Sequence, residues 1–196
     1  MSIINTASAH HITNNFGLFE IKVFQDIKGI EHIALVKGKV SKQSKVLCRV
    51  FSECITGMVL DSADCDCAAQ LNYCMKLIDD TGNGVLILLK QEGRGHGLTT
   101  KIKALNYKNQ GYDTFSAVEI LGKTADCRTY DIAAEIIKSL AIDSINLITS
   151  NPTKLASIRA AGIIVENVYY TPMFVNERNK IHLLSKIERG HKFLEK

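Results

Sequence analysis

The sequence predicts a single α/β domain with a mixed, partly parallel sheet and helices on both faces. One observation is the short apolar run Val85–Leu89 in the segment Val85–Lys90, whose length and continuity are typical of a buried central strand. Another is the segment Arg128–Leu140, in which apolar residues recur at helical spacing on one face. A third is the strand–helix–strand order over residues 144–169, which is typical of a β-α-β unit with parallel strands.

The other elements follow from local patterns. The first two predicted strands cover residues 32–40 and 45–53, and we expect them to pair around the polar turn Ser41–Ser44. A predicted helix through residues 71–78 ends at the turn-forming residues Thr81–Gly84. A second, over residues 101–110, ends at Gly111. The predicted elements are strands over 32–40 and 45–53, a helix through 71–78, a helix over 101–110, and the final unit of strand 144–149, helix 152–160 and strand 163–169.

The end of the chain is polar and basic from about residue 174 to residue 196. Ile181, Leu184 and Ile187 form an apolar stripe at helical spacing within it. We expect a C-terminal helical or mobile tail. The pattern does not distinguish a surface helix, a dimer contact and a mobile segment.

Composition limits the class of protein. A chain of 196 residues is long enough to bury its own core, and we expect one domain over residues 1–196. The net charge of +4 is mild and forms no basic stripe, which argues against a nucleic-acid binder. No apolar run could span a bilayer, and Met1–His11 lacks the pattern of a signal peptide. We therefore expect a reduced, cytoplasmic protein that binds no membrane.

Three of the six cysteines form a candidate metal site. Cys65 and Cys67 are two residues apart, so both sulfurs can point the same way, and a loop that brings back Cys54 completes a three-thiolate cup. Thiolates suit Zn²⁺, and three protein ligands leave a fourth position open for water, as in catalytic zinc sites. The alternatives are disulfides, which the expected compartment disfavours, and a structural zinc completed by His96 or Cys127.

A glycine-rich loop follows the central strand. The segment Gln91–Gly97 combines three glycines with two charged residues and a histidine, and it lies where open α/β sheets bind ligands. We favour a binding loop over a plain turn, although the spacing does not match a dinucleotide fingerprint.

Two further segments, each just before a predicted helix, allow two interpretations. Asn151 and Pro152 form a helix start, where backbone N–H groups beside Thr149 and Lys154 could bind an anion. By itself this pattern favours an ordinary capped helix. Asp126 and Arg128 are either a helix cap with a solvated charge, or a proton acceptor with a phosphate-directed cation.

Taken together, these motifs resemble those of the GTP cyclohydrolase II family. They are collinear from about residue 31 to residue 165, and no second catalytic domain accompanies them, as in the stand-alone form of the family. The matching segments are Arg49–Gly57, Cys65–Cys67 with Gln70 and Leu71, Gln91–Arg94 with Gly97 and Leu98, Asn109–Thr114, Asp126 with Arg128, and Thr149–Lys154.

The resemblance implies the fold of that family and its reaction. Such enzymes open the imidazole ring of GTP at carbon C8 and release formate and pyrophosphate. The implied product is a diaminopyrimidine ribosylamino phosphate, the first compound of riboflavin synthesis. The resemblance also implies a homodimer, Mg²⁺ on the GTP polyphosphate, and one Zn²⁺ per subunit bound by Cys54, Cys65 and Cys67.

The resemblance also assigns roles to individual residues. Arg128 attacks the α-phosphorus to give a guanylyl-enzyme, and Asp126 accepts a proton. An arginine nucleophile is chemically unusual because its free pKa lies above about 12. The residues implied to bind GTP are Arg49, Val50, Phe51, Ser52, Glu53, Gln70, Glu92, Gly93, Arg94, Thr114, Thr149 and Lys154.

Four positions depart from the family pattern. Phe51 replaces a usual histidine, Asp64 a usual arginine, and Ala68 a usual glycine. Leu105 stands where the family carries a tyrosine near the base. Two alternatives therefore accompany the main expectation: an enzyme that stops at a formamidopyrimidine product for a specialised-metabolite pathway, and a non-catalytic GTP-binding regulator.

Overall fold

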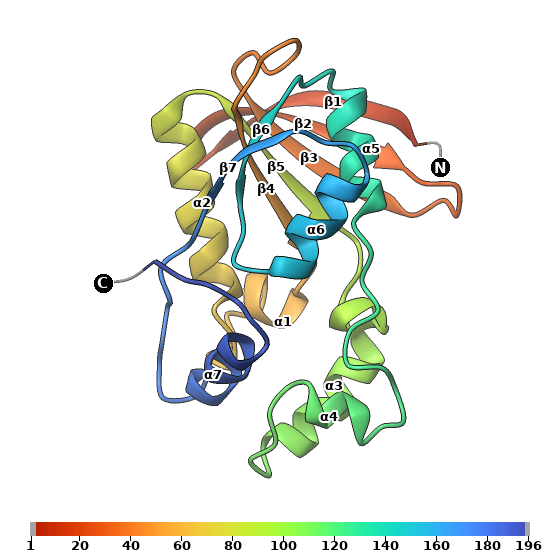
Figure 1. Ribbon diagram of the computed structural model, residues 1–196, viewed down its shortest axis with the longest axis vertical. Helices are drawn as coiled ribbons and strands as arrows, with labels where there is room; N and C mark the ends of the chain where they lie inside the picture. Colours follow the sequence, from red (N-terminus) through yellow and green to blue (C-terminus); the bar gives the residue numbers. More distant parts are fainter. Residues whose placement is uncertain (1–2, 195–196) are drawn as a thin grey trace. The chain divides into compact units, whose positions relative to one another are not determined.

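A computed structural model describes residues 3–194 of the chain (Figure 1). The chain forms an α/β fold whose strands belong to one seven-stranded sheet. The strands are β1 (Ile4–Thr13), β2 (Gly17–Gln25), β3 (Glu31–Lys37), β4 (Val46–Ser52), β5 (Gly84–Leu89), β6 (Ile145–Ile148) and β7 (Val165–Tyr169). The helices are α1 (Ile55–Met58), α2 (Cys67–Thr81), the 3-10 turn η1 (Gly93–Gly95), α3 (Gly97–Lys108), α4 (Ser116–Glu119), α5 (Asp131–Ser139), α6 (Pro152–Ala160) and α7 (Lys180–Glu188).

The chain divides into two compact units. The sheet unit comprises the described parts of Met1–Phe51, Asn72–Lys90 and Thr129–Thr171. The loop unit comprises the described parts of Ser52–Leu71, Gln91–Arg128 and Pro172–Lys196. Almost all of the sheet lies in the first unit and all three cysteines of the predicted metal site lie in the second, so the two units are described separately.

The sheet is mixed, as predicted. Its strand order is β1-β2-β3-β5-β4-β6-β7. Strands β1, β2, β3 and β5 pair antiparallel, whereas β4, β6 and β7 pair parallel. The parallel pairing of β6 and β7 across α6 confirms the predicted β-α-β unit.

The predicted hairpin between the first two strands is wrong. Both strands exist, but β5 lies between β3 and β4 in the sheet. The connecting residues contain a turn, in which the Gln43 N–H donates to the Val40 carbonyl at 3.2 Å, but this turn does not join two paired strands. The same residues also bond to the connection that precedes β6, from Lys42 N to Ala141 O at 2.6 Å and from Asp143 N to Gln43 O at 3.0 Å.

Strands β1 and β2 were not predicted. All residues of β1 are exposed except Thr13 at its end, so the strand lacks the alternation of apolar and polar residues that reveals a half-buried strand. Strand β2 alternates weakly, with Phe19 and Phe24 buried. The sequence of β2 nevertheless alternates Phe19, Ile21 and Val23 with Glu20 and Lys22, a pattern typical of a strand that could have predicted it.

Helices cover both faces of the sheet, as predicted (Figure 1). One face carries Val85, Ile87 and Leu89, which belong to one buried cluster with residues of α5 and α6. The opposite face includes Gly84, where an added Cβ would lie 3.0 Å from the side chain of Ile78 in α2. Because successive strand residues point to opposite faces, α2 lies across the sheet from α5 and α6.

The loop unit has little apolar core of its own. Ala104, Ala117 and Val118 form a small buried cluster between α3 and α4. Helix α7 lies within the C-terminal tail, and the stripe of Ile181, Leu184 and Ile187 is exposed on it, whereas Leu183 is buried. No helix in residues 3–194 has the length and apolar character needed to cross a membrane.

Candidate metal centre and active site

The three predicted metal ligands converge in the loop unit. The sulfurs of Cys54, Cys65 and Cys67 all lie within 4.8 Å of one another, and the Cys54 and Cys65 sulfurs are 3.8 Å apart. Two thiolates about 2.3 Å from a zinc ion at the tetrahedral angle stand about 3.8 Å apart. The sulfur spacing therefore fits a single zinc ion.

Gly57 makes room for this arrangement. It lies in the short helix α1, and an added Cβ would come within 2.4 Å of the Cys65 sulfur and 3.2 Å of the Cys54 sulfur. The first distance is far below van der Waals contact, and the second is tighter than ordinary contact. The absence of a side chain at residue 57 therefore allows the three cysteines to approach one another.

A lysine that sequence analysis did not identify contacts the centre. Lys101 Nζ lies 3.0 Å from the Cys54 sulfur and 2.9 Å from Glu92 Oε1. The pKa of the Cys54 thiol is lowered, first by hydrogen bonds from Cys65 and Cys67 and further by the Lys101 ammonium. The Lys101 ammonium therefore compensates negative charge on the Cys54 sulfur.

Glu92 stabilises the loop that carries Cys54. Its buried carboxylate accepts hydrogen bonds from the Ile55 N–H at 2.6 Å and from the Gly93 N–H at 2.7 Å, besides the contact with Lys101. A carboxylate with several donors is well compensated in a buried position. Glu92, predicted to bind GTP, thus also fixes the backbone next to a metal ligand.

The two residues considered as a fourth ligand contact each other instead. The Cys127 sulfur lies 3.7 Å from His96 Nδ1, and His96 Nε2 lies 2.8 Å from the carbonyl of Thr124. Within residues 3–194, the group with metal-ligand geometry contains Cys54, Cys65 and Cys67 alone. This geometry favours a centre with three protein ligands.

Asp64, one of the departures from the family pattern, is paired with cations. Its carboxylate lies 3.5 Å from Lys108 Nζ and 3.1 Å from Arg178 Nη2, and Lys108 also donates to the Asp64 carbonyl at 2.9 Å. The negative charge that the sequence places beside Cys65 is therefore offset within the same unit.

Arg94 lies at the tip of the glycine-rich loop in a strained backbone conformation. Its φ of 57° is in the left-handed region, which is uncommon for a residue with a side chain and is often found at functional sites. Its guanidinium donates to the Thr114 hydroxyl at 2.7 Å and carbonyl at 3.1 Å and stacks 3.4 Å from the Phe115 ring centre. Burial, then the charge of Arg128, lowers the pKa of Arg94 to about 10, so Arg94 is a cation at neutral pH.

Asp126 and Arg128 form a forked ion pair ahead of α5. Arg128 Nε donates to Asp126 Oδ1 at 2.9 Å, and Nη2 donates to Oδ2 at 2.5 Å. Helix α5 begins only at Asp131, so Asp126 is not its cap and Arg128 is not in its first turn. Burial acts to raise the pKa of Asp126, but hydrogen bonds and charge from Arg128 outweigh it and leave that pKa below its ordinary value.

The glycine-rich loop contacts both parts of this site. Glu92 bonds to the segment of Cys54, and the Arg94 carbonyl accepts from the Cys127 N–H at 3.1 Å. Gly95 permits that second contact, because a Cβ there would lie 2.8 Å from the Cys127 sulfur. The loop unit thus brings the cysteines, Arg94 and the Asp126–Arg128 segment into one bonded framework.

Other predicted GTP contacts in the loop unit take part in local hydrogen bonds. The Ser52 hydroxyl accepts from Gln91 Nε2 at 3.0 Å, and Gln70 Nε2 donates to Asp66 Oδ2 at 2.5 Å. Glu53 directly precedes Cys54, and Gly93 begins the turn η1.

The remaining predicted contacts lie in the sheet unit. Lys154 is buried and donates from Nζ to the Val50 carbonyl at 2.5 Å, and Arg49 donates to the Ile148 carbonyl at 2.9 Å. The Arg49 guanidinium also lies 4.3 Å from the ring centre of Phe51. The Thr149 N–H bonds to the Tyr169 carbonyl at 2.9 Å.

Asn151 caps α6, which agrees with the interpretation of residues 149–154 as an ordinary capped helix. Its side chain accepts from the N–H groups of Thr153 at 2.9 Å and Lys154 at 3.3 Å. Pro152 occupies the first helical position. The capping side chain uses the backbone donors that the anion-binding interpretation had invoked, so the ordinary capped helix is the better description of the backbone there.

The chain is similar to known proteins over most of its length. The family described as GTP cyclohydrolase II matches residues 5–169. The chain is 41% identical over 188 residues to a protein named GTP cyclohydrolase-2 from Acinetobacter baylyi, which covers 95% of this chain and 94% of that protein.

The chain is also similar to longer proteins. It is 42% identical over 193 residues to "Riboflavin biosynthesis protein RibBA" of Chlamydia muridarum, covering 97% of this chain and 46% of that protein. A protein of the same name from Bacillus velezensis is 39% identical, with 97% of this chain and 48% of that protein covered. The chain therefore spans about half the length of these RibBA relatives.

Proposed function

The chain belongs to the GTP cyclohydrolase II family, and from that membership we propose that it opens the imidazole ring of GTP at C8. The proposed products are formate, pyrophosphate and a diaminopyrimidine ribosylamino phosphate, for riboflavin synthesis. The observation that carries the proposal is the sulfur cup of Cys54, Cys65 and Cys67, with sulfurs within 4.8 Å of one another. We propose further that the protein acts as a cytoplasmic homodimer, as the family resemblance implies.

Lys101 and Glu92 provide charged groups beside the three sulfurs, and these groups support metal binding. A zinc ion bound by the three cysteines supplies, when bound, a water whose pKa is lowered toward about 7. Lys101 and Glu92 fix the position of the Cys54 segment on which this binding depends. The protein's own contribution at this point is therefore to orient three sulfurs and to compensate their charge.

The phosphate end of GTP requires cations, and two arginines provide them. Arg94 and Arg128 lie close enough that the charge of Arg128 lowers the pKa of Arg94. Two like charges at one place are stabilised by a polyanion such as the triphosphate. We propose that Mg²⁺ accompanies the triphosphate, because the leaving pyrophosphate carries concentrated charge.

Asp126 and Arg128 are the proposed catalytic residues. Asp126 is a carboxylate at neutral pH, because its pKa lies below the ordinary value, and a proton acceptor needs that form. It also orients the Arg128 guanidinium through its forked contact. The attack of Arg128 on the α-phosphorus is carried over from the family resemblance. The remaining predicted contacts, from Arg49 to Glu53 and at Gln70, Thr114, Thr149 and Lys154, are proposed to bind GTP.

One observation favours a second outcome, in which formate is retained. Leu105 lies four residues after Lys101 in α3, so both side chains project from the same face of the helix. Lys101 contacts the Cys54 sulfur, so Leu105 projects toward the side of α3 that carries the metal centre. A leucine there offers no hydroxyl for the second hydrolysis, and the product would then be a formamidopyrimidine.

The test is turnover of GTP by the purified protein with Zn²⁺ and Mg²⁺. Formate, pyrophosphate and product mass are measured together. One formate for each GTP consumed supports the complete reaction, and pyrophosphate without formate supports the arrested one. Tight GTP binding without any product would replace both proposals with a nucleotide-binding regulator.

The variant Leu105→Tyr separates the first two outcomes. If Leu105 limits the second hydrolysis, the tyrosine variant releases about 10-fold or more formate per pyrophosphate, since one hydrogen bond in a catalytic site contributes on the order of 10- to 1,000-fold. The matched control is Ile102→Tyr, at an exposed position of the same helix. An unchanged ratio in Leu105→Tyr would show that Leu105 does not determine the product.

A further inference from the structure

A buried carboxylate lies between two of the cysteines. Asp66 separates Cys65 from Cys67, and its side chain has no exposure to solvent. Taking such a charge out of water costs several kcal/mol unless it is paired, on the order of magnitude known for buried ions. The groups that compensate Asp66 therefore decide whether the Cys65–Cys67 segment keeps its conformation.

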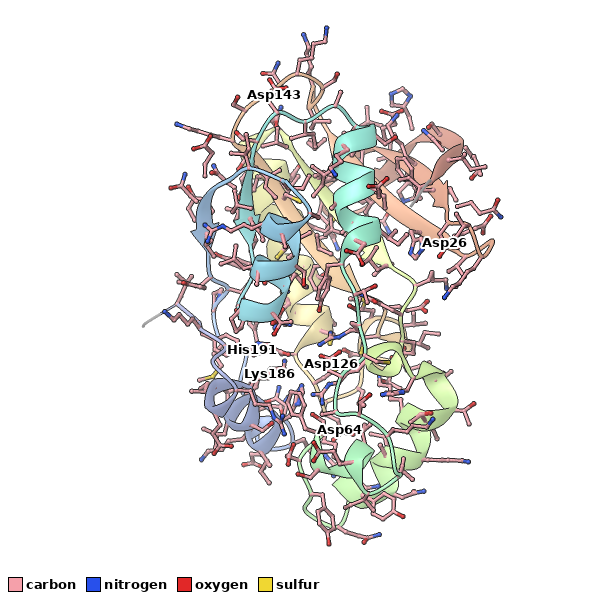
Figure 2. The ribbon with its side chains drawn as sticks, turned by 45° about the vertical axis from the view of Figure 1, so that its right-hand side comes forward. Asp26, Asp64, Asp126, Asp143, Lys186 and His191 are labelled. Atoms are coloured by element: carbon pink, nitrogen blue, oxygen red, sulfur yellow. The ribbon has the colours of Figure 1, made fainter. Side chains whose placement is uncertain are left out.

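The cationic partner of Asp66 comes from the C-terminal helix. Lys186 Nζ in α7 lies 3.0 Å from Asp66 Oδ1, although the two residues are 120 positions apart in the sequence. Gln70 donates to the other carboxylate oxygen at 2.5 Å. Lys186 lies on α7, and Asp64 lies on the loop that leads to Cys65 (Figure 2).

Further contacts fix α7 and the segment before it against the same loop. Asn176 Nδ2 donates to the Ala63 carbonyl at 3.1 Å, and Arg178 contacts Asp64 at 3.1 Å. His182 Nδ1 lies 2.8 Å from the Thr114 hydroxyl, which in turn accepts from Arg94. The C-terminal segment thus contacts the cysteine loop at Ala63, Asp64 and Asp66, of which Asp66 is the one with a fully buried side chain.

We propose that Lys186 is a positioning residue of the metal centre. By neutralising Asp66, it keeps Cys65 and Cys67 in the conformation that binds the ion together with Cys54. Helix α7 lies outside residues 5–169, the part of the chain that matches the family. The inference rests on the proposed zinc centre and adds to it a residue that touches neither the metal nor the nucleotide.

The test measures zinc affinity apart from catalysis. Metal-free, fully reduced protein is titrated with Zn²⁺ against a chromogenic chelator, for the wild type and for Lys186→Met, which removes the charge but keeps the length of the side chain. We expect zinc binding to weaken about 10- to 100-fold in Lys186→Met, the range known for residues that support metal ligands. Lys186→Arg is expected to restore most of the affinity.

Two further variants identify the mechanism. Lys180→Met makes the same substitution at an exposed position of α7 and is expected to bind zinc as the wild type does. Asp66→Asn combined with Lys186→Met removes both charges, so it leaves no uncompensated carboxylate and is expected to bind zinc more tightly than Lys186→Met alone.

The outcomes separate this inference from the proposed function. Wild-type protein that binds no zinc would overturn the metal centre itself. Tight zinc binding by the wild type with equal affinity in folded Lys186→Met would overturn the positioning role only. If Lys186→Met does not fold, Lys186→Gln removes the same charge while keeping a polar side chain, and undiminished zinc binding by that folded variant would overturn the inference.

Discussion

The sheet unit and the loop unit are stabilised by different interactions. In the sheet unit, helices α5 and α6 bury a large cluster of Val, Ile and Leu side chains against one face of the sheet. In the loop unit, the clustered apolar core is small. Ion pairs, such as Lys101 with Glu92 and Lys186 with Asp66, connect its segments to one another. Burial of apolar area does not depend on exact atom positions, whereas ion pairs and thiolate clusters do.

This difference follows from what each unit does. A sheet with a continuous apolar core supplies rigidity, and its residues can be exchanged if their volume is kept. The loop unit carries the candidate metal ligands together with Arg94 and Arg128. The proposed chemistry needs these particular side chains at particular distances from one another. We therefore expect metal removal and core mutation to affect the two units separately.

Removal of zinc is expected to have the largest effect. Loss of a bound metal removes several kcal/mol of transition-state stabilisation, so GTP turnover should fall on the order of 1,000-fold or more in a chelator. Hydrogen exchange resolved by peptide should accelerate over residues 54–70 and stay slow in β5 and β6. Equal acceleration in both regions would contradict the separation of the two units, and readdition of Zn²⁺ is the control.

A cavity made in the sheet unit is expected to lower stability while leaving zinc binding unchanged. Ile137 in α5 is fully buried, and Ile137→Ala should lower the free energy of unfolding by about 2–5 kcal/mol, measured by urea denaturation. Zinc affinity should change by no more than about twofold, because independent sites contribute additively. The control Ile181→Ala, on the exposed side of α7, should change stability by less than about 0.5 kcal/mol.

The smallest expected effect is a dependence of stability on pH. Burial, together with the charges of Lys186, Arg94 and Lys108, lowers the pKa of His182 well below its ordinary value, with Cys54 opposing. Above pH about 6.5 His182 is neutral in both the folded and unfolded states. Below that pH the unfolded chain binds the extra proton more readily, so stability falls as the pH decreases toward the folded-state pKa.

His182→Asn tests this dependence. Asparagine keeps a hydrogen-bonding atom near Thr114 but does not titrate, so the melting temperature should decrease less between pH 7 and pH 5 than it does in the wild type. The control His10→Asn, on the exposed strand β1, should keep the wild-type slope. If both variants have that slope, the pH dependence of stability comes from other groups.

The accuracy of sequence analysis also differs between the two units. Strand β5 was predictable from its continuous apolar run, helix α5 from the apolar period on its buried face, and helix α6 from the capping Asn151 and Pro152 at its start. The pairing of β3 with β4 was wrong, because two neighbouring strands in sequence give no sign that a third will enter between them. The start of α5 was placed too early, because Asp126 bonds to Arg128 instead of capping the helix.

By itself the sequence determined the candidate ligands and the residues around them. Cys65 and Cys67 are two residues apart, and the motifs with Cys54, Arg94, Asp126 and Arg128 are local patterns that can be recognised without a fold. The tertiary structure alone showed that Lys101 contacts Cys54 from 47 residues away and that Lys186 compensates Asp66 from 120 residues away. The physical reason is that periodicity records which side of an element is buried, whereas the choice of an ion-pair partner depends on the path of the whole chain.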